Sequence, residues 1–219
     1  MHFTVQNLIY INKEIDIKLN DVKKAEKPKI IAVSKTFPME NILPLIEYGH
    51  LDYGENKVQE ALEKWSEIKL TNKDIKLHLL GKLQRNKVKS AVRIFDYIHS
   101  VDSKKLAKKI AEENFFQKKN IKVFIQVNIG DEDQKSGLNA KDIKEFYLYC
   151  KEINLNVIGL MCIPPMNENP SKYFSKIKKL NDELKFIHLS LGMSSDYIKA
   201  IEYSSTFLRI GTNIFGSRG

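Results

Sequence analysis

Lys35 ends a run of β-branched and small apolar residues, 29–35, that is typical of a buried strand. Because side chains alternate along a strand, Ile31, Val33 and Lys35 share one face. If Ile31 and Val33 fill an interior, Lys35 is the last inward side chain of its strand. A lysine there is poorly hydrated, which favours the neutral amine, and a neutral amine can attack an aldehyde. The alternative is a surface lysine that only follows the strand, and position alone does not decide between them.

Arg209 lies inside a second apolar run, between Leu208 and Ile210. Burying a guanidinium is costly unless it meets an acceptor. The sequence therefore predicts that Arg209 faces a carboxylate, a phosphate or an acceptor on a ligand. Gly211 and Thr212 follow directly, and small residues there leave backbone N–H groups exposed that can bind a phosphate.

Segment 192–196 offers a similar anion seat, since Ser194 is predicted to open a helix there. Ordinary helix capping explains either segment by itself. Both together, with a strand-end lysine and a buried arginine, favour one binding site. Asn56 follows another short strand, where it could donate to a ligand oxygen or cap a helix. His78 lies inside a predicted strand and is interpreted as a core histidine with satisfied hydrogen bonds.

The elements that must position these residues alternate along the chain. Apolar residues at helical spacing predict a first helix over residues 3–22. Thr36 is expected to cap the helix after the first strand, with Pro38 in its first turn. Short apolar runs predict eight strands, each but the last followed by an amphipathic stretch, at 29–35, 51–54, 76–80, 97–101, 122–128, 157–163, 188–191 and 206–210.

Strands that alternate with helices predict a parallel sheet, and eight strands are the number that closes a barrel. An open doubly wound sheet would need a Gly-rich turn after the first strand, which segment 34–38 is not. The predicted fold class is therefore α/β, a single eight-stranded parallel β/α (TIM-type) barrel with an extra N-terminal helix, in one domain over residues 1–219. Sites in such barrels lie at the carboxyl ends of the strands.

The composition limits the classes of partner. The chain has 219 residues, 42% of them apolar, which suits one sizeable core. The net charge of +9 comes from lysines scattered among acidic residues, without a basic tail or a nucleic-acid-binding signature, although it could favour anionic ligands. No run approaches the roughly 20 apolar residues of a membrane span. Without a secretory signal, and with only Cys150 and Cys162, the sequence predicts a cytoplasmic protein with no nucleic-acid or membrane partner.

From about residue 29 onward, in order, the sequence resembles the pyridoxal phosphate homeostasis protein family. It departs from the family at Leu77, where an aromatic residue is common, and at Cys162, where a small residue is common. The segments that carry the resemblance are Ala32-Val33-Ser34-Lys35-Thr36, Gly54-Glu55-Asn56, Gly81 with Leu83-Gln84 and Asn86-Lys87, Lys135-Ser136-Gly137, Gly159-Leu160-Met161, Leu189-Ser190-Leu191-Gly192-Met193-Ser194 and Arg209-Ile210-Gly211-Thr212-Asn213-Ile214-Phe215-Gly216.

The resemblance implies a barrel like the N-terminal domain of alanine racemase. It implies that the barrel binds pyridoxal 5′-phosphate (PLP), with Lys35 as the Schiff-base lysine. The other contacts that it implies are with the pyridine nitrogen for Arg209, with the phosphate for Ser194, Gly211 and Thr212, and beside the cofactor for Asn56 and Met193.

The residues favour holding this cofactor over using it. A PLP enzyme needs an electron sink and a base aimed at the substrate Cα. Arg209 beside the ring nitrogen would disfavour protonation of that nitrogen and so weaken the sink. Racemases of this fold also take a base from a C-terminal β-domain, whereas this sequence stops at Gly219, just after the last predicted strand. We therefore expect a non-catalytic PLP-binding protein of intracellular PLP homeostasis.

Other functions stay open on the sequence. The main alternative is a PLP-dependent amino-acid racemase or lyase, and a basic RNA-associated protein is a third hypothesis, which predicts affinity that falls steeply with salt. For a carrier, PLP-dependent apo-enzymes would be the recipients of the cofactor. A monomer is the expected state, because no swapped second domain is predicted.

Overall fold

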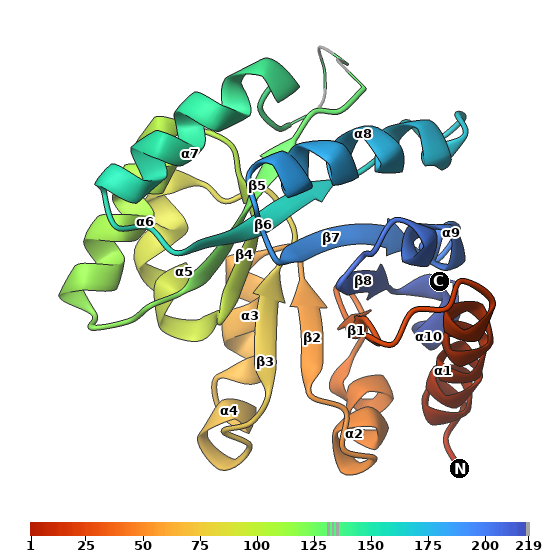
Figure 1. Ribbon diagram of the computed structural model, residues 1–219. Coiled ribbons are helices and arrows are strands. Elements are labelled where there is room, and N and C mark those ends of the chain that lie inside the picture. The colour runs from red at the N-terminus through yellow and green to blue at the C-terminus, as the bar shows by residue number, and fades with distance from the viewer. Residues whose placement is uncertain (131, 133, 135, 218–219) are drawn as a thin grey trace.

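The computed structural model describes residues 1–130, 132, 134 and 136–217. Within these residues, eight parallel strands close a barrel in the order β1 to β8, with the helices outside it (Figure 1). The predicted fold class is confirmed. The strands are β1 Lys29–Val33, β2 Asp52–Glu55, β3 Lys76–Leu79, β4 Tyr97–Val101, β5 Lys122–Val127, β6 Val157–Cys162, β7 His188–Met193 and β8 Phe207–Ile210.

The helices follow the strands as the sequence predicts, and no helix of the described residues is long and apolar enough to cross a membrane. The N-terminal helix α1 packs against α2, α9 and α10, and Asn7 Nδ2 donates to the carbonyl of Ile214 at 3.0 Å. The bounds are α1 Phe3–Asp21, α2 Met39–Glu47, α3 Val58–Trp65, α4 Ile68–Thr71, α5 Val88–Ile94, α6 Lys104–Phe116, α7 Ile143–Glu152, α8 Pro170–Glu183, α9 Tyr197–Glu202 and α10 Thr212–Phe215, with 3-10 turns η1 Arg85–Lys87 and η2 Ala140–Asp142.

Side-chain alternation divides the apolar residues between two cores. Ile30 and Ala32 of β1 face outward into the layer between strands and helices. Ile31, between them, faces inward and packs in a separate cluster that fills the barrel. The other buried members of this inner cluster come from four further strands: Tyr97, Phe124, Met161 and Phe207. The register predicted for the first strand is therefore confirmed at Ile31.

The predicted cap at Thr36 is wrong. Helix α2 begins at Met39, and Pro38 takes the N-cap position instead of lying in the first turn. Thr36 has a φ of 66° and donates its backbone N–H to Glu60 on α3. The turn after β1 is closed by a local bond from the Phe37 N–H to the Ser34 carbonyl at 3.1 Å and is held by the contact from the distant helix α3.

Candidate functional site

A cavity of about 630 Å³ opens where the strands end at the carboxyl side of the barrel. Its volume lies in the range of small-molecule sites. The cavity brings together residues that lie in or just after β1, β2, β7 and β8 and are up to 180 positions apart, from Val33 to Asn213 (213 − 33). The residues expected to contact the cofactor all line it: Lys35, Asn56, Met193, Ser194, Arg209, Gly211 and Thr212.

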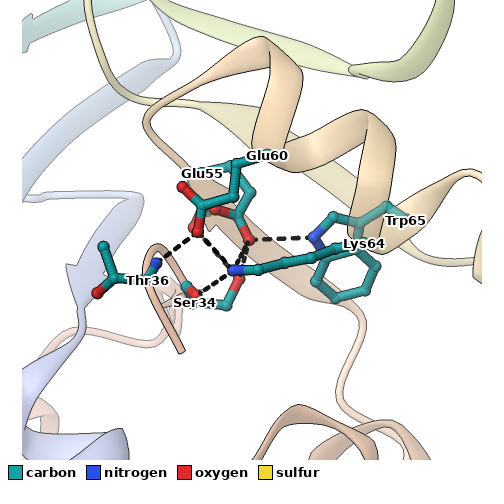
Figure 2. A network of polar contacts seen from close by, with 7 residues as sticks. Ser34, Thr36, Glu55, Glu60, Lys64 and Trp65 are labelled. Atoms are coloured by element: carbon teal, nitrogen blue, oxygen red, sulfur yellow. Dashed lines mark hydrogen bonds and ion pairs between the residues drawn. The ribbon is translucent and has the colours of Figure 1, made fainter. Parts of the chain in front are cut away.

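The turn that carries Lys35 rests on a buried carboxylate (Figure 2). Glu55 is fully buried at the end of β2, where its Oε1 accepts hydrogen bonds from Ser34 Oγ at 2.8 Å and Trp65 Nε1 at 3.1 Å. Lys64 Nζ lies 3.4 Å from the same oxygen. Burial raises the pKa of Glu55, and the Lys64 cation and both donors oppose that rise. These contacts hold Ser34 and so set the direction in which the chain leaves β1 toward Lys35.

The other side of the turn is held by α3 (Figure 2). The Thr36 N–H donates to Glu60 Oε1 at 2.5 Å. Lys64 Nζ joins the two sides, because it donates to Glu60 Oε1 at 2.6 Å and to the Ser34 carbonyl at 2.9 Å. A β-branched residue at positive φ is strained, so these bonds offset a cost of about 1–3 kcal/mol at Thr36. Lys35 is thus half-buried at the cavity wall between anchored neighbours.

Arg209 is held in the floor of the cavity with 5% of its surface exposed. Nη1 donates to both the carbonyl and the Oγ of Ser190 at 2.7 Å, and Nη2 donates to the carbonyl of Cys162 at 2.9 Å. The sequence predicted a carboxylate, a phosphate or an acceptor on a ligand, whereas the acceptors within the protein are oxygens of the neighbouring strands β6 and β7. Burial lowers the pKa of Arg209, while Cys162 and Asp196 oppose that shift. Arginine nevertheless stays charged, and the remaining N–H groups of the Arg209 guanidinium can donate to a ligand.

Backbone N–H groups converge on one oxygen at the junction of β7 and β8. Ser194 Oγ accepts from the N–H groups of Gly211 and Asn213, each at 3.3 Å. Asn213 Nδ2 also donates to the Ser194 carbonyl at 3.0 Å. An anionic oxygen is a stronger acceptor for such donors than a hydroxyl. The arrangement is therefore suited to the phosphate group of a ligand.

The prediction that Ser194 opens a helix is wrong. Helix α9 begins at Tyr197, and Asp196 is its N-cap residue. Asp196 Oδ1 accepts the N–H of Met193 at 2.6 Å, which closes a turn between β7 and the helix. Ser194 lies in that turn, so its hydroxyl faces β8 rather than the first turn of α9.

Comparison with known proteins identifies the family of this chain. Residues 15–219 match the family model described as alanine racemase, N-terminal domain. The chain is 43% identical over 202 residues to the pyridoxal phosphate homeostasis protein of Aquifex aeolicus, with 87% of each chain covered. It is 36% identical over 225 residues to that of Pasteurella multocida, with 97% of each covered. The chain belongs to the pyridoxal phosphate homeostasis protein family.

The barrel of this chain is similar to the barrels of several solved structures. PipY of Synechococcus elongatus, solved with PLP bound, superposes with a TM-score of 0.80 at 32% identity, covering 92% of this chain and 100% of that one. An alanine racemase of Clostridium difficile superposes with a TM-score of 0.71 at 15% identity, covering 94% of this chain and 57% of that one. The second likeness shows the shared fold alone.

The family motifs Gly54-Glu55-Asn56 and Gly81 meet in space. Asn56 follows β2 and lines the cavity. A Cβ on Gly81 would lie 2.2 Å from the carbonyl oxygen of Asn56, so only glycine allows β3 to pass this close. Gly81 therefore holds the backbone of Asn56 against the end of β3. The family motif residue Lys135 lies outside the described residues.

Sequence reasoning missed the apolar wall of the cavity. Phe37, Leu80, Ile163 and Met166 line it together with the polar residues. The ring of Phe37 stacks on Phe215 with 4.9 Å between centroids, which ties the wall to α10. These residues follow β1, β3 and β6, so a search of every strand end for large apolar side chains could have found them.

A further cavity, of about 560 Å³, opens at the amino ends of the strands. The lysines in its lining, Lys24, Lys27 and Lys29, all contact other groups of the protein. Lys24 Nζ donates to the carbonyls of Ile201 and Glu202, and Lys29 Nζ lies over the ring of Phe207 at 5.9 Å. Its position is also opposite to the face where barrels of this type carry their sites. The cavity at the carboxyl ends is therefore the better candidate.

Proposed function

We propose that this protein binds PLP in the cavity at the carboxyl ends of the strands and holds it covalently on Lys35, in the service of intracellular PLP homeostasis. The observation that carries the proposal is the meeting of Lys35, buried Arg209 and the phosphate-suited donors at Ser194 in one cavity. Membership of the family and the PLP-bound structure of PipY, which is 32% identical to this chain, support it.

The residues fit the cofactor at its aldehyde, its phosphate and its ring nitrogen. When bound, PLP supplies an aldehyde carbon that takes up the Lys35 amine as a C=N bond, with the aldehyde oxygen leaving as water. Ser194, Gly211 and Thr212 offer hydroxyl and backbone donors for the phosphate. Arg209 would offer charged N–H donors to the ring nitrogen, and Asn56 and Met193, which also line the cavity, would lie beside the ring.

We further propose that the protein stores the cofactor without efficient turnover of amino acids. Apart from Lys35, the described residues that line the cavity include no Asp, Glu, His, Cys or Tyr. Racemisation and related reactions need a base at the substrate Cα, and two-sided proton exchange needs a second one. The fixed positive charge of Arg209 also disfavours a proton on the ring nitrogen. PLP-dependent apo-enzymes as recipients, a monomeric state, a cytoplasmic location and a single domain over 1–219 stay predictions.

Titration with PLP tests the proposal. We expect the purified protein to develop the visible absorbance of lysine-bound cofactor, to lose it with hydroxylamine, and to lack it in Lys35→Ala. Lys57→Ala is the matched control, because Lys57 is exposed and follows Asn56 directly. Unchanged colour in Lys35→Ala would refute the anchor. Exchange of the Cα hydrogen of any amino acid, well above the rate with free PLP, would favour the racemase or lyase alternative.

A further inference from the structure

A chain of polar side chains crosses the interior of the barrel. It starts at Arg209, whose Nη1 donates to Ser190 Oγ at 2.7 Å. Ser190 Oγ lies 3.0 Å from His99 Nδ1, and His99 Nε2 lies 3.0 Å from His78 Nδ1. His78 Nε2 lies 2.9 Å from Asp52 Oδ1. Arg209 lines the cavity, whereas Asp52 is the first residue of β2, so the chain joins the two ends of the barrel.

The hydrogen bonds of this chain are all donated in one direction, from Arg209 toward Asp52. The ionised carboxylate of Asp52 can only accept, so the neutral imidazoles of His78 and His99 each donate from Nε2 and accept at Nδ1. Ser190 Oγ therefore donates its proton to His99 Nδ1 and accepts from Arg209, which has donors only. His99 then carries its proton on Nε2 and donates to His78 Nδ1. His78 in turn carries its proton on Nε2 and donates to the carboxylate of Asp52. Every link points from the cation at one end to the anion at the other, so the bond dipoles add.

Aromatic rings insulate both histidines from water. His78 stacks on Tyr97 with 4.3 Å between centroids and 6° between planes, and His99 stacks on Phe124 at 4.3 Å. The ring centroid of Phe207 lies 5.7 Å from that of His78 and 6.0 Å from that of His99. Such surroundings strengthen each satisfied hydrogen bond and make a broken one costly.

The charges agree with this direction. Burial lowers the pKa of His78, against the opposing effect of Asp52, and burial with the nearby His78 and Arg209 lowers the pKa of His99 well below its usual value. Burial acts to raise the pKa of Asp52, but the hydrogen bond from His78 and the nearby positive groups, Lys29 among them, leave it lowered. Neutral imidazoles therefore link an ionised carboxylate to the arginine.

We propose that Asp52, His78, His99 and Ser190 are positioning residues that fix the guanidinium of Arg209 beside the cofactor ring through this one-way hydrogen-bond chain. The guanidinium is planar, so anchoring Nη1 on Ser190 and Nη2 on the Cys162 carbonyl sets the plane of the whole group. The inference rests on the proposed function in one respect, the placement of Arg209 toward the ring of PLP. The direction of the chain does not depend on the cofactor.

Histidine-selective ¹⁵N NMR of the whole protein tests the direction, with and without PLP. The chain requires both His78 and His99 to be neutral Nε2–H tautomers at neutral pH. His78→Phe and His99→Phe assign the signals by their loss. An Nδ1–H tautomer or a protonated ring at either position would overturn the chain, whether or not the protein binds PLP.

Affinity and spectrum of the bound cofactor test the positioning role. We expect His99→Phe, which keeps an aromatic ring on Phe124, to weaken PLP binding about tenfold, or about 1.4 kcal/mol, and to shift the absorbance maximum of the lysine-bound cofactor. His99→Gln should restore both, because its amide can accept from Ser190 and donate to His78. Asp52→Asn keeps an acceptor without the charge. Its PLP affinity and absorbance maximum should lie between those of wild type and of Asp52→Ala.

His188→Phe is the matched control, a histidine of β7 that contacts Phe207 but lies outside the chain. It should leave both affinity and spectrum unchanged. If wild type binds PLP and His99→Phe behaves identically, the positioning role is wrong and the proposed function stands. If wild type does not bind PLP, the proposed function fails together with the positioning role, and the NMR spectra alone decide the chain.

Discussion

Replacement of Lys64 by methionine tests how the turn of Lys35 is held. Methionine keeps the apolar stem but removes the Nζ contacts with the Ser34 carbonyl, with Glu60 and with Glu55. The Lys64 side chain is only 15% exposed and that of Glu55 is fully buried, so solvent cannot replace the lost cation. We expect Lys64→Met to lower the free energy of unfolding by about 2–4 kcal/mol, the range for breaking buried charged hydrogen bonds.

The stability that Lys64→Met loses should depend on pH, because Lys64 lowers the pKa of both Glu55 and Glu60. The unfolded Glu55 carboxyl titrates near 4.5, and its folded pKa is raised, so the folded state binds its proton more strongly. Stability therefore falls as the pH rises from about 4.5 through the folded pKa. Without Lys64 the folded pKa of Glu55 rises further, and Glu60 loses a partner that lowers its pKa. The stability of Lys64→Met should decrease more steeply with pH than that of wild type.

Urea unfolding at several pH values, with PLP titration of each variant, is the assay. Lys69→Met is the matched control, because Lys69 Nζ also joins a carboxylate, Asp96 at 2.6 Å, to a carbonyl, that of Ile94 at 3.0 Å, but away from the cavity. Lys69→Met should lower the free energy of unfolding by about 1 kcal/mol and leave the PLP affinity unchanged. Adding Glu55→Gln to Lys64→Met should recover part of the lost stability. Parallel pH curves for Lys64→Met and wild type, or losses that simply add in the double variant, would refute the reasoning.

Further predictions concern single positions around the cavity. Gly81→Ala should lower the free energy of unfolding by about 1–3 kcal/mol in urea unfolding, because its Cβ would meet the Asn56 carbonyl; a loss near zero would show that the strand end can shift. Ser194→Ala should weaken PLP more than pyridoxal, about tenfold by titration, since it acts at the phosphate; equal losses for both ligands would place Ser194 elsewhere. Burial raises the pKa of Cys162 to about 12, so the native thiol should resist iodoacetamide at mildly alkaline pH by mass spectrometry, and rapid labelling before unfolding would contradict its burial.

The sequence predicted those features that local patterns determine. Alternation in residues 29–35 gave the inward register of Ile31, and the apolar runs placed every strand within a few residues. The first strand was predicted two residues too long, because β1 ends at Val33 and Lys35 lies in the turn that follows. Local patterns failed where a distant group decides the conformation. Thr36 is bound by Glu60 on another helix. The start of α9 was missed by a local shift instead, because Asp196 rather than Ser194 takes the N-cap position.

The polar networks were beyond prediction from one sequence. His78 was correctly interpreted as a satisfied core histidine. Its partners, His99 and Asp52, come from neighbouring strands, and a single chain does not reveal which inward positions share a layer of the barrel. The anchoring of the Lys35 turn by Lys64 was missed for the same reason, because nothing local in α3 shows which loop its side chains reach.

Borohydride trapping tests the central claim most directly. The protein is incubated with PLP, reduced so that any C=N bond becomes a stable amine, digested, and mapped by mass spectrometry. The chain has 32 lysines, so random modification would spread over many peptides. We predict one dominant label, on Lys35, that Lys35→Ala abolishes and Lys57→Ala retains. A dominant label on any other lysine, or the same label pattern in Lys35→Ala, would contradict Lys35 as the covalent anchor.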